Sequence, residues 1–250
     1  MCKFLTKLFK RKKRKDTEEV KNAPVYSLVY EHKHDFYNHW DVVTEGSANW
    51  RKNAGLIPTF NGDAIQFPVV IDESGKVRVA ALKTKDYYDE GAFECLARFK
   101  GGKGSWPAIW MTNKYDGNKE EYYEIDLSEY YENRKETTSS YHCYESMVLN
   151  KRSSYITTSC PINPNDWTKF RCEWDKDSIR VYINGMVVLT IVNTGDSNIF
   201  PVKEERRKFN VILSMQYATN KRLQAYDTTE LPLWMEVKDI KIYKLINPTT

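Results

Sequence analysis

Hydrophobic and polar residues alternate in short runs along most of the chain, with the two-residue period of half-buried β-strands. The clearest runs predict strands over residues 76–82, 92–100, 108–112, 122–130, 178–185, 187–192, 209–215 and 234–244. Turn-forming residues occupy 72–75 and 101–104, and Asn184-Gly185 between two apolar runs predicts a tight hairpin. After residue 20 no stretch keeps a 3.6-residue period over three turns, so we expect strands rather than helices.

This pattern predicts an all-β protein, a two-sheet sandwich of the jelly-roll kind. The 250 residues fit one domain, and 17 tyrosines, 10 phenylalanines and 7 tryptophans supply enough apolar side chain for a core. No apolar run approaches the ~20 residues of a membrane-spanning helix. We therefore expect one folded domain over residues 23–250, preceded by a separate segment over residues 1–22.

That first segment is strongly basic. Residues 1–15 hold eight lysines and arginines and no acidic residue. Phe4 with Leu8 and Leu5 with Phe9 lie four apart, so a short helix here would carry one apolar stripe. Lysines interrupt the apolar residues, which is not the pattern of a secretory signal. We expect a basic tail or short helix that docks on a protein assembly, an anionic membrane or nucleic acid; a solvated tail is the alternative.

The charge balance of the remaining chain argues against a nucleic-acid-binding domain. The whole chain carries +4, and subtracting the eight charges of residues 1–15 leaves −4 for the rest. Nucleic-acid binding needs a basic surface, so such a role would belong to the tail alone. The five cysteines form no C-x-x-C pair, which predicts no zinc site. We expect mostly buried free thiols.

One predicted strand, residues 122–130, carries three acids among aromatic and apolar residues. Glu124 and Asp126 are two apart and therefore point to the same face of the strand. Glu129 would face the other way in a regular strand, but a β-bulge near Leu127-Ser128 would return it to the first face. Three carboxyl groups on one face repel one another, so at least one pKa must rise. Such a conflict is typical of paired catalytic carboxyl groups, whereas a charged outer face of a sheet is the simpler alternative.

Several segments occur around this strand in a distinctive order. They are Gly102–Met111 with its G-x-W-P-A-x-W motif, Glu124–Glu129 with its E-x-D-x-x-E motif, Tyr141-His142-Cys143, Asp166–Phe170 with Glu173-Trp174, Ile179–Gly185, and Val237–Tyr243. The series resembles glycoside hydrolase family 16, which includes laminarinases, lichenases, agarases and carrageenases. The resemblance extends from about Tyr26 to Ile246. It implies a β-jelly roll of two curved antiparallel sheets with the glycan in a concave cleft.

The resemblance also implies roles for the acids. Glu124 matches the family's nucleophile, Glu129 its general acid/base, and Asp126 the carboxylate between them that tunes both. A retaining mechanism needs two carboxyl groups about 5–5.5 Å apart. Glu124 and Glu129 begin farther apart than that along the strand, but long side chains on a concave sheet converge.

Five further residues are candidates for substrate binding. Trp106 and Trp110 would stack on sugar rings, with a place in the sandwich core as the alternative. Tyr122 lies two residues before the nucleophile on its face and would form a subsite wall. His142 matches a cleft histidine of the family, and Glu94 resembles a substrate-contacting glutamate, although Cys95-Leu96 departs from the family pattern.

The resemblance predicts no metal or other cofactor for catalysis. Many family members bind a structural calcium ion through an Asp of the last strand, but alignment of Val237–Tyr243 puts Lys238 at that position, which makes a calcium site doubtful.

Together these features predict an endo-acting, retaining glycoside hydrolase that cleaves a β-linked polysaccharide. The alternative is a non-catalytic carbohydrate-binding or structural decoration module on the same fold. Polysaccharides of this kind lie outside cells, whereas the chain shows no secretory signal. Carriage on a virus particle, with residues 1–15 as the anchor, is therefore one expected location, and the location is otherwise left open.

Overall fold

The computed structural model describes residues 24–32, 37–46, 51, 53–114, 121–132, 135–146, 151–217 and 227–246. The basic segment over residues 1–22 lies outside the described residues. Within the described parts of the chain, no helix has the length and apolar character needed to cross a bilayer.

The described residues form an almost entirely β structure. Its strands are β1 (Val25–Glu31), β2 (Trp40–Val42), β3 (Ala54–Leu56), β4 (Thr59–Asn61), β5 (Ala64–Ile71), β6 (Val77–Thr84), β7 (Gly91–Lys100), β8 (Ser105–Asn113), β9 (Tyr122–Tyr131), β10 (Glu136–Ser146), β11 (Lys151–Pro161), β12 (Thr168–Trp174), β13 (Ser178–Ile183), β14 (Met186–Val192), β15 (Phe209–Tyr217) and β16 (Leu233–Ile246). Two short 3₁₀ helices, η2 (Glu204–Arg206) and η3 (Thr228–Glu230), lie between the last strands. The predicted all-β fold is confirmed, and each predicted strand begins and ends within a few residues of an observed one.

The strands form two sheets that share β6. Hydrogen bonds connect them in the order β11-β10-β9-β8-β15-β6-β5-β16-β7-β12-β13-β14. We call β11, β10, β9, β8 and β15 the first sheet, and β5, β16, β7, β12, β13 and β14 the second sheet. The C-terminal part of β6 pairs with β15, whereas its N-terminal part pairs with β5. This one strand therefore turns the corner between the two layers of the sandwich.

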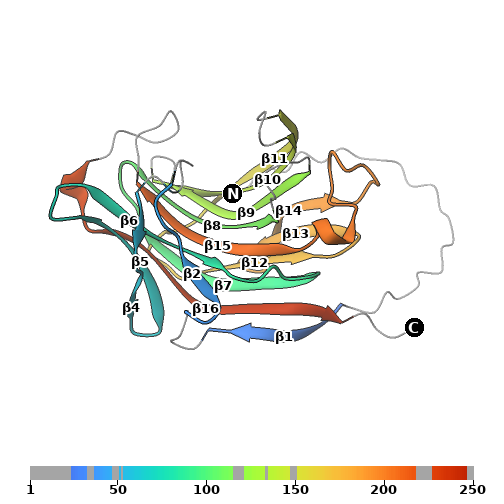
Figure 1. Ribbon diagram of the computed structural model, residues 1–250, viewed down its shortest axis with the longest axis horizontal. Coiled ribbons are helices and arrows are strands. Elements are labelled where there is room, and N and C mark those ends of the chain that lie inside the picture. Colours follow the sequence, from blue (N-terminus) through green and yellow to red (C-terminus); the bar gives the residue numbers. More distant parts are fainter. Residues whose placement is uncertain are drawn as a thin grey trace.

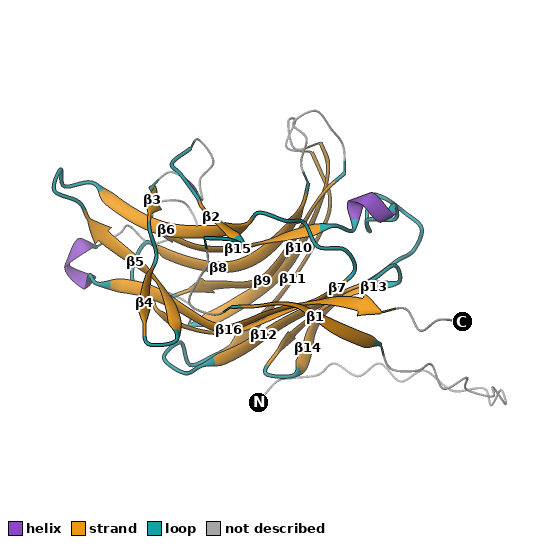
Figure 2. Cartoon of the chain, turned by 60° about the horizontal axis from the view of Figure 1, so that its bottom comes forward, coloured by secondary structure: helices purple, strands orange, loops and turns teal. Residues whose placement is uncertain are grey.

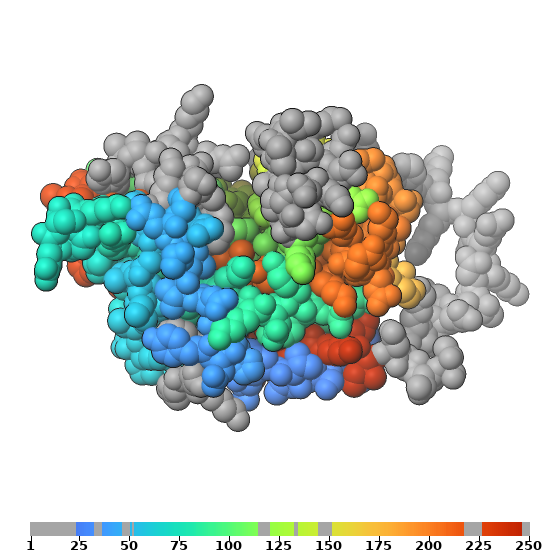
Figure 3. Space-filling model, in the orientation of Figure 1, coloured from blue at the N-terminus to red at the C-terminus, as the bar shows by residue number. Residues whose placement is uncertain are grey.

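The strands of the first sheet curve together, which leaves one of its faces concave (Figures 1 and 2). Strand β1 extends the second sheet by pairing with β16, and the two run side by side along the lower edge of the molecule (Figure 3). The outcome is the two-layered, jelly-roll arrangement that the strand pattern predicted.

One large hydrophobic core fills the space between the sheets. Phe99 on β7 stacks on Tyr130 of β9, with ring centroids 5.3 Å apart and planes 7° apart. Phe99 also contacts Phe170 of β12, at 6.2 Å between centroids. All three rings are fully buried. Because Tyr130 belongs to the acid-bearing strand β9, this stack supports that strand on its core side.

Local turn chemistry follows the sequence closely. Asn184 and Gly185 both have positive φ, 49° and 81°, as the type I′ turn of a two-residue hairpin requires, and they join β13 to β14. Cys95, Cys143, Cys160 and Cys172 are all free thiols, three of them buried. Burial raises the pKa of the Cys143 thiol to about 11, so it remains protonated.

The stack beneath β9 gives a test of the packing. Phe99→Ala would remove a ring that contacts both sheets and leave a cavity that the rigid strands cannot close. Such a substitution in a core typically costs about 3–5 kcal/mol of unfolding free energy. Val187→Ala, at an exposed position, should change stability by no more than about 0.5 kcal/mol. Urea unfolding of the two variants measures the difference, and equal stabilities would contradict this account.

Candidate active site

The three acids of β9 lie on one face because the strand contains a β-bulge. On one side, Ile109 of β8 pairs with Ser128 and Trp110 pairs with Asp126, so Leu127 is an extra residue. On the other side, Thr138 pairs with Glu129 and Ser140 with Asp126, so only Ser139 lies opposite the two residues Leu127 and Ser128. The predicted bulge is therefore present at its predicted position.

Hydrogen bonds from β10 hold the bulge in place. The Ser139 hydroxyl donates to the Leu127 carbonyl oxygen at 2.7 Å, and the hydroxyls of Ser128 and Thr137 lie 2.7 Å apart. Leu127 itself is fully buried in the main core. The Leu127 carbonyl oxygen in the bulge thus has a hydrogen-bond partner, while Glu129 is returned to the face of Glu124 and Asp126.

These three acids line a single pocket on the concave face of the first sheet. Its other lining residues are Trp106, Ala108 and Trp110 of β8 and Ser214 and Gln216 of β15. Trp110 packs with Ala108 and Ile212 in a small cluster separate from the main core. Its indole N–H donates to the Ser214 hydroxyl at 3.2 Å. The two tryptophans that the sequence singled out therefore both belong to the pocket.

Glu124 has a strongly raised pKa. Burial, and then the negative charge of Asp126, raise its pKa to about 7. Two neighbours act in the opposite direction and stabilise its charged form. His142 lies 3.8 Å from its Oε1, and the Tyr122 hydroxyl donates to its Oε2 at 2.8 Å. Tyr122 is buried, so the structure places it as a hydrogen-bond donor to Glu124 and not among the pocket-lining residues.

Glu129 is held by two donors at the same oxygen. The Trp106 indole N–H and the Tyr131 hydroxyl both donate to its Oε1, each at 3.1 Å. The rings of Trp106 and Tyr131 also lie against each other, 6.0 Å between centroids. Tyr131 was missed by sequence reasoning, although strand alternation two residues after Glu129 places it on the same face.

His142 connects the acids to β10. It pairs with Glu124 in the register of the two strands, and its Nε2 lies 3.1 Å from Asp126 Oδ2. Ligand atoms of Glu124, Asp126 and His142 lie within 4.8 Å of one another, a spacing that also suits a metal ion. Hydrolysis by paired carboxyl groups requires no metal, so the arrangement is sufficient as an acid-base site.

Glu94 is not brought to this pocket. It lies on β7 in the second sheet, where its carboxylate accepts from Arg171 at 2.7 Å and lies 3.1 Å from Lys169 Nζ. The Tyr243 hydroxyl donates to its other oxygen at 3.1 Å. These contacts make Glu94 part of a cross-strand ion-pair row on the outer face of the second sheet, and its role in substrate binding stays a prediction.

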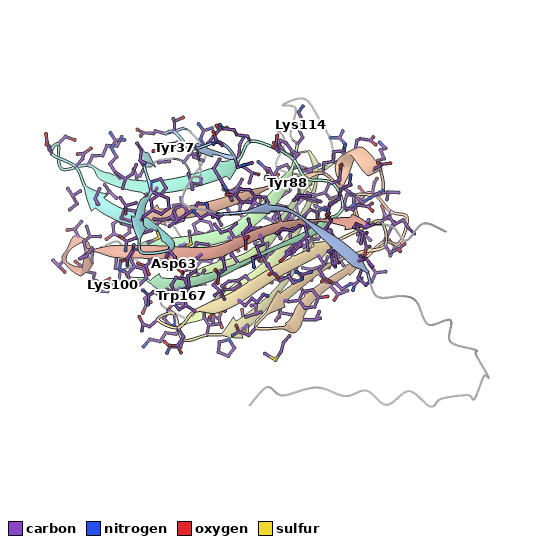
Figure 4. The ribbon with its side chains drawn as sticks, turned by 90° about the horizontal axis from the view of Figure 1, so that it is seen from below. Tyr37, Asp63, Tyr88, Lys100, Lys114 and Trp167 are labelled. Atoms are coloured by element: carbon purple, nitrogen blue, oxygen red, sulfur yellow. The ribbon has the colours of Figure 1, made fainter. Side chains whose placement is uncertain are left out.

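Lys238, where the family pattern has a calcium-binding Asp, also lies on the second sheet. Its ammonium is 3.2 Å from Asp63 Oδ2 and 4.7 Å from the centre of the Trp167 ring. Asp63 and Trp167 lie near each other on this side of the molecule (Figure 4). A fixed positive charge thus occupies the position, held by a carboxylate and an aromatic face.

Comparison with known proteins adds an independent line of evidence. The model of the family "Glycosyl hydrolases family 16" matches residues 45–229, nearly three quarters of the chain. The chain belongs to glycoside hydrolase family 16. The members of this family are glycosyl hydrolases, the class that the motif series in the sequence predicted. The matched range includes every residue of the pocket.

Individual relatives of this family-16 enzyme are distant. The keratan-sulfate endo-1,4-beta-galactosidase of Sphingobacterium multivorum is 25% identical over 222 residues, which cover 82% of this chain and 51% of that protein. The chain thus spans about half the length of that curated relative.

Two solved structures share the fold. The laminarinase from Rhodothermus marinus has a TM-score of 0.75 at 20% identity, covering 90% of this chain and 99% of its own. The kappa-carrageenase from Pseudoalteromonas carrageenovora has a TM-score of 0.67 at 16% identity, and the match covers 93% of this chain and 100% of the carrageenase chain. At these identities the comparison establishes the common jelly roll.

The raised pKa of Glu124 predicts a pH-dependent effect on stability. Between its ordinary value of 4.5 and about 7, Glu124 binds a proton in the folded state that it loses in the unfolded state, so its contribution to stability falls as pH rises. Glu124→Gln removes this titration. The melting temperature of the variant relative to the native protein should therefore rise between pH 4.5 and pH 8. A constant or falling difference in thermal unfolding would contradict the raised pKa.

Proposed function

We propose that this family-16 enzyme is an endo-acting, retaining hydrolase of a β-linked polysaccharide. The observation that carries the proposal is the bulge in β9, which brings three carboxyl groups to one pocket beside two tryptophans. Among the described residues the pocket lies on the concave face of the first sheet, and such a face suits a chain that is bound along its length and cleaved internally.

Glu124 acts as the nucleophile in this proposal and Glu129 as the general acid/base. In the first step Glu124 attacks the anomeric carbon while Glu129 donates a proton to the departing glycosidic oxygen. In the second step Glu129 accepts a proton from water, and that water displaces the sugar from Glu124. The two donors at Glu129 Oε1 fix its orientation, which supports its use in both directions of proton transfer.

Asp126 and His142 set the charge of the nucleophile. Glu124 must be ionised to attack, yet burial and Asp126 favour its protonated form. The hydrogen bond donated by the Tyr122 hydroxyl and the proximity of His142 counter this effect by lowering the pKa of Glu124. Glu124 loses its negative charge when it bonds to the anomeric carbon and regains it when water displaces the sugar, so groups that stabilise its ionised form prepare it for each attack.

The tryptophans suggest how sugar is recognised. Trp106 is only partly buried, and it borders Glu129 in the pocket. Indole rings pack well against apolar faces of other groups, and Trp106 is positioned to contact a sugar ring next to the cleaved bond. Relatives named for keratan sulfate, laminarin and carrageenan all act on long polysaccharides, which supports the same substrate class here.

The location of the enzyme remains the prediction made from the sequence. Attachment to a virus particle through residues 1–15 concerns residues outside the described part of the chain, and it rests on their charge and apolar spacing alone.

Removing either carboxyl group should nearly abolish hydrolysis. Glu124→Gln and Glu129→Gln should each lower kcat by at least about 10²–10⁴-fold on the best substrate, because each residue takes part in bond breaking. Screening laminarin, lichenan, agarose, carrageenan and porphyran with the native protein identifies that substrate. Glu173→Gln, on the second sheet, is the matched control and should retain activity. Native activity in either pocket variant would refute the roles, and binding without cleavage by the native protein would favour a non-catalytic module.

Stereochemistry tests the nucleophile separately. A covalent intermediate on Glu124 inverts the anomeric carbon twice, so the new reducing end should first appear as the β-anomer. Proton NMR during the first minutes of cleavage, before mutarotation, distinguishes the anomers. An initial α-anomer would show direct attack by water and remove the nucleophilic role from Glu124.

A further inference from the structure

A positively charged cluster borders the acidic pocket on the same face of the first sheet. Register places Glu124 of β9 beside His142 of β10, and His142 beside Tyr155 of β11. The next row runs from Tyr122 to Tyr144 to Arg152. The cluster that we consider consists of Arg152, Tyr144 and Tyr155.

A second β-bulge brings Arg152 to this face. Cys143 pairs with Ser154 and Tyr144 with Arg152, so Ser153 is an extra residue in β11. The Ser153 hydroxyl lies against the core side of the sheet, 3.1 Å from the Cys143 sulfur. Arg152 consequently points to the opposite, concave side, where Tyr144 and Tyr155 lie. Adjacent strands lie about 4.8 Å apart, so the backbone of Arg152 is only about 10 Å from that of Tyr122.

The arginine is held by aromatic groups. Its guanidinium carbon lies 5.1 Å from the centre of the Tyr144 ring and 4.8 Å from that of Tyr155. One of its nitrogens donates to the Tyr144 hydroxyl at 2.8 Å. The stacking of the His142 and Tyr144 rings, with planes 13° apart, connects the cluster to the acids. The position of the charge is therefore fixed by packing before any ligand arrives.

The charge of Arg152 has no carboxylate partner among the residues that the structure describes. Most other described arginines do have one: Arg78 pairs with Asp72, Arg98 with Glu236, Arg171 with Glu94, Arg180 with Asp175, Arg206 with Glu121 and Arg207 with Glu90. Arg152 is also solvent-exposed, and Tyr155 beside it is 43% exposed. An accessible guanidinium that is held by two aromatic rings and has no described carboxylate partner is well suited to bind an anion from solution.

We propose that Arg152, Tyr144 and Tyr155 form a subsite for an anionic substituent of the glycan, a sulfate ester or a carboxylate. The proposal rests on the hydrolase function above and adds that the natural substrate is an acidic polysaccharide. The planar fork of the guanidinium pairs with two oxygens of either group, and the exposed Tyr155 ring supports the sugar that carries it. An anionic sugar next to three acids would otherwise be repelled, so this cation selects for charge and fixes the register of the chain in the cleft.

The experiment compares a sulfated glycan with the same polymer without its sulfate groups, and adds a carboxylated glycan as a third probe. Kappa-carrageenan, the same polymer after chemical desulfation, and hyaluronan serve as sulfated, neutral and carboxylated probes. Binding of their oligosaccharides to the Glu124→Gln protein is measured by calorimetry, and cleavage by the native protein by reducing ends. Adding Arg152→Gln should lower the ratio of affinities for charged over neutral chains by about 10–100-fold, the usual effect of losing charge-assisted hydrogen bonds. Arg152→Lys keeps the positive charge but lacks the planar guanidinium fork, so it should lower this affinity ratio less than Arg152→Gln does.

Arg180→Gln is the matched control, because Arg180 lies on β13 of the second sheet and should leave the ratio unchanged. Weaker binding after desulfation of kappa-carrageenan identifies sulfate as the ligand, and hyaluronan binding that Arg152→Gln weakens identifies carboxylate. If Arg152→Gln alters neutral and charged chains equally, or no charged chain is preferred by the Glu124→Gln protein, the subsite is refuted. Charge-dependent binding without any cleavage by the native protein would instead refute the hydrolase function and leave the subsite standing.

Discussion

The insertion of one residue into β9 determines what this protein can do. Without the bulge at Leu127-Ser128, strict alternation would turn Glu129 into the hydrophobic core and leave only Glu124 and Asp126 on the concave face. A buried, unpaired carboxylate would also destabilise the fold. With the bulge, Leu127 fills the core and all three acids face the solvent side. Fold stability and chemical function therefore depend on the same backbone irregularity.

Three neighbouring carboxyl groups repel one another, and the surrounding residues stabilise the three negative charges to different degrees. Glu129 receives two hydrogen bonds and Asp126 lies beside His142, whereas Glu124 is desolvated next to a like charge. Burial and the charge of Asp126 raise the pKa of Glu124 to about 7, although Tyr122 and His142 act in the opposite direction. Aromatic groups supply most of the donors, which explains why this strand region contains so many tyrosines and a tryptophan. Their rings exclude water while their polar ends position the acids.

Much of the fold and the centre of the site could be predicted from the sequence, because both depend on local alternation. The strands, the Asn184-Gly185 hairpin and the bulge all follow from the two-residue period and turn chemistry. Contacts between strands distant in sequence could not be predicted in this way. Ser214 and Gln216 line the pocket because β15 pairs with β8. Glu94 lies away from the pocket because β7 belongs to the second sheet. Arg152 was missed because its orientation depends on a second bulge.

The corner formed by β6 has a consequence for recognition. Because one strand hydrogen-bonds to both layers, the sheets are a single connected surface and cannot hinge apart or close around a ligand without breaking backbone hydrogen bonds. The curvature of the concave face is thus set before any polysaccharide arrives. In the proposed function, a bound glycan therefore has to adapt its own conformation to the curvature of this face.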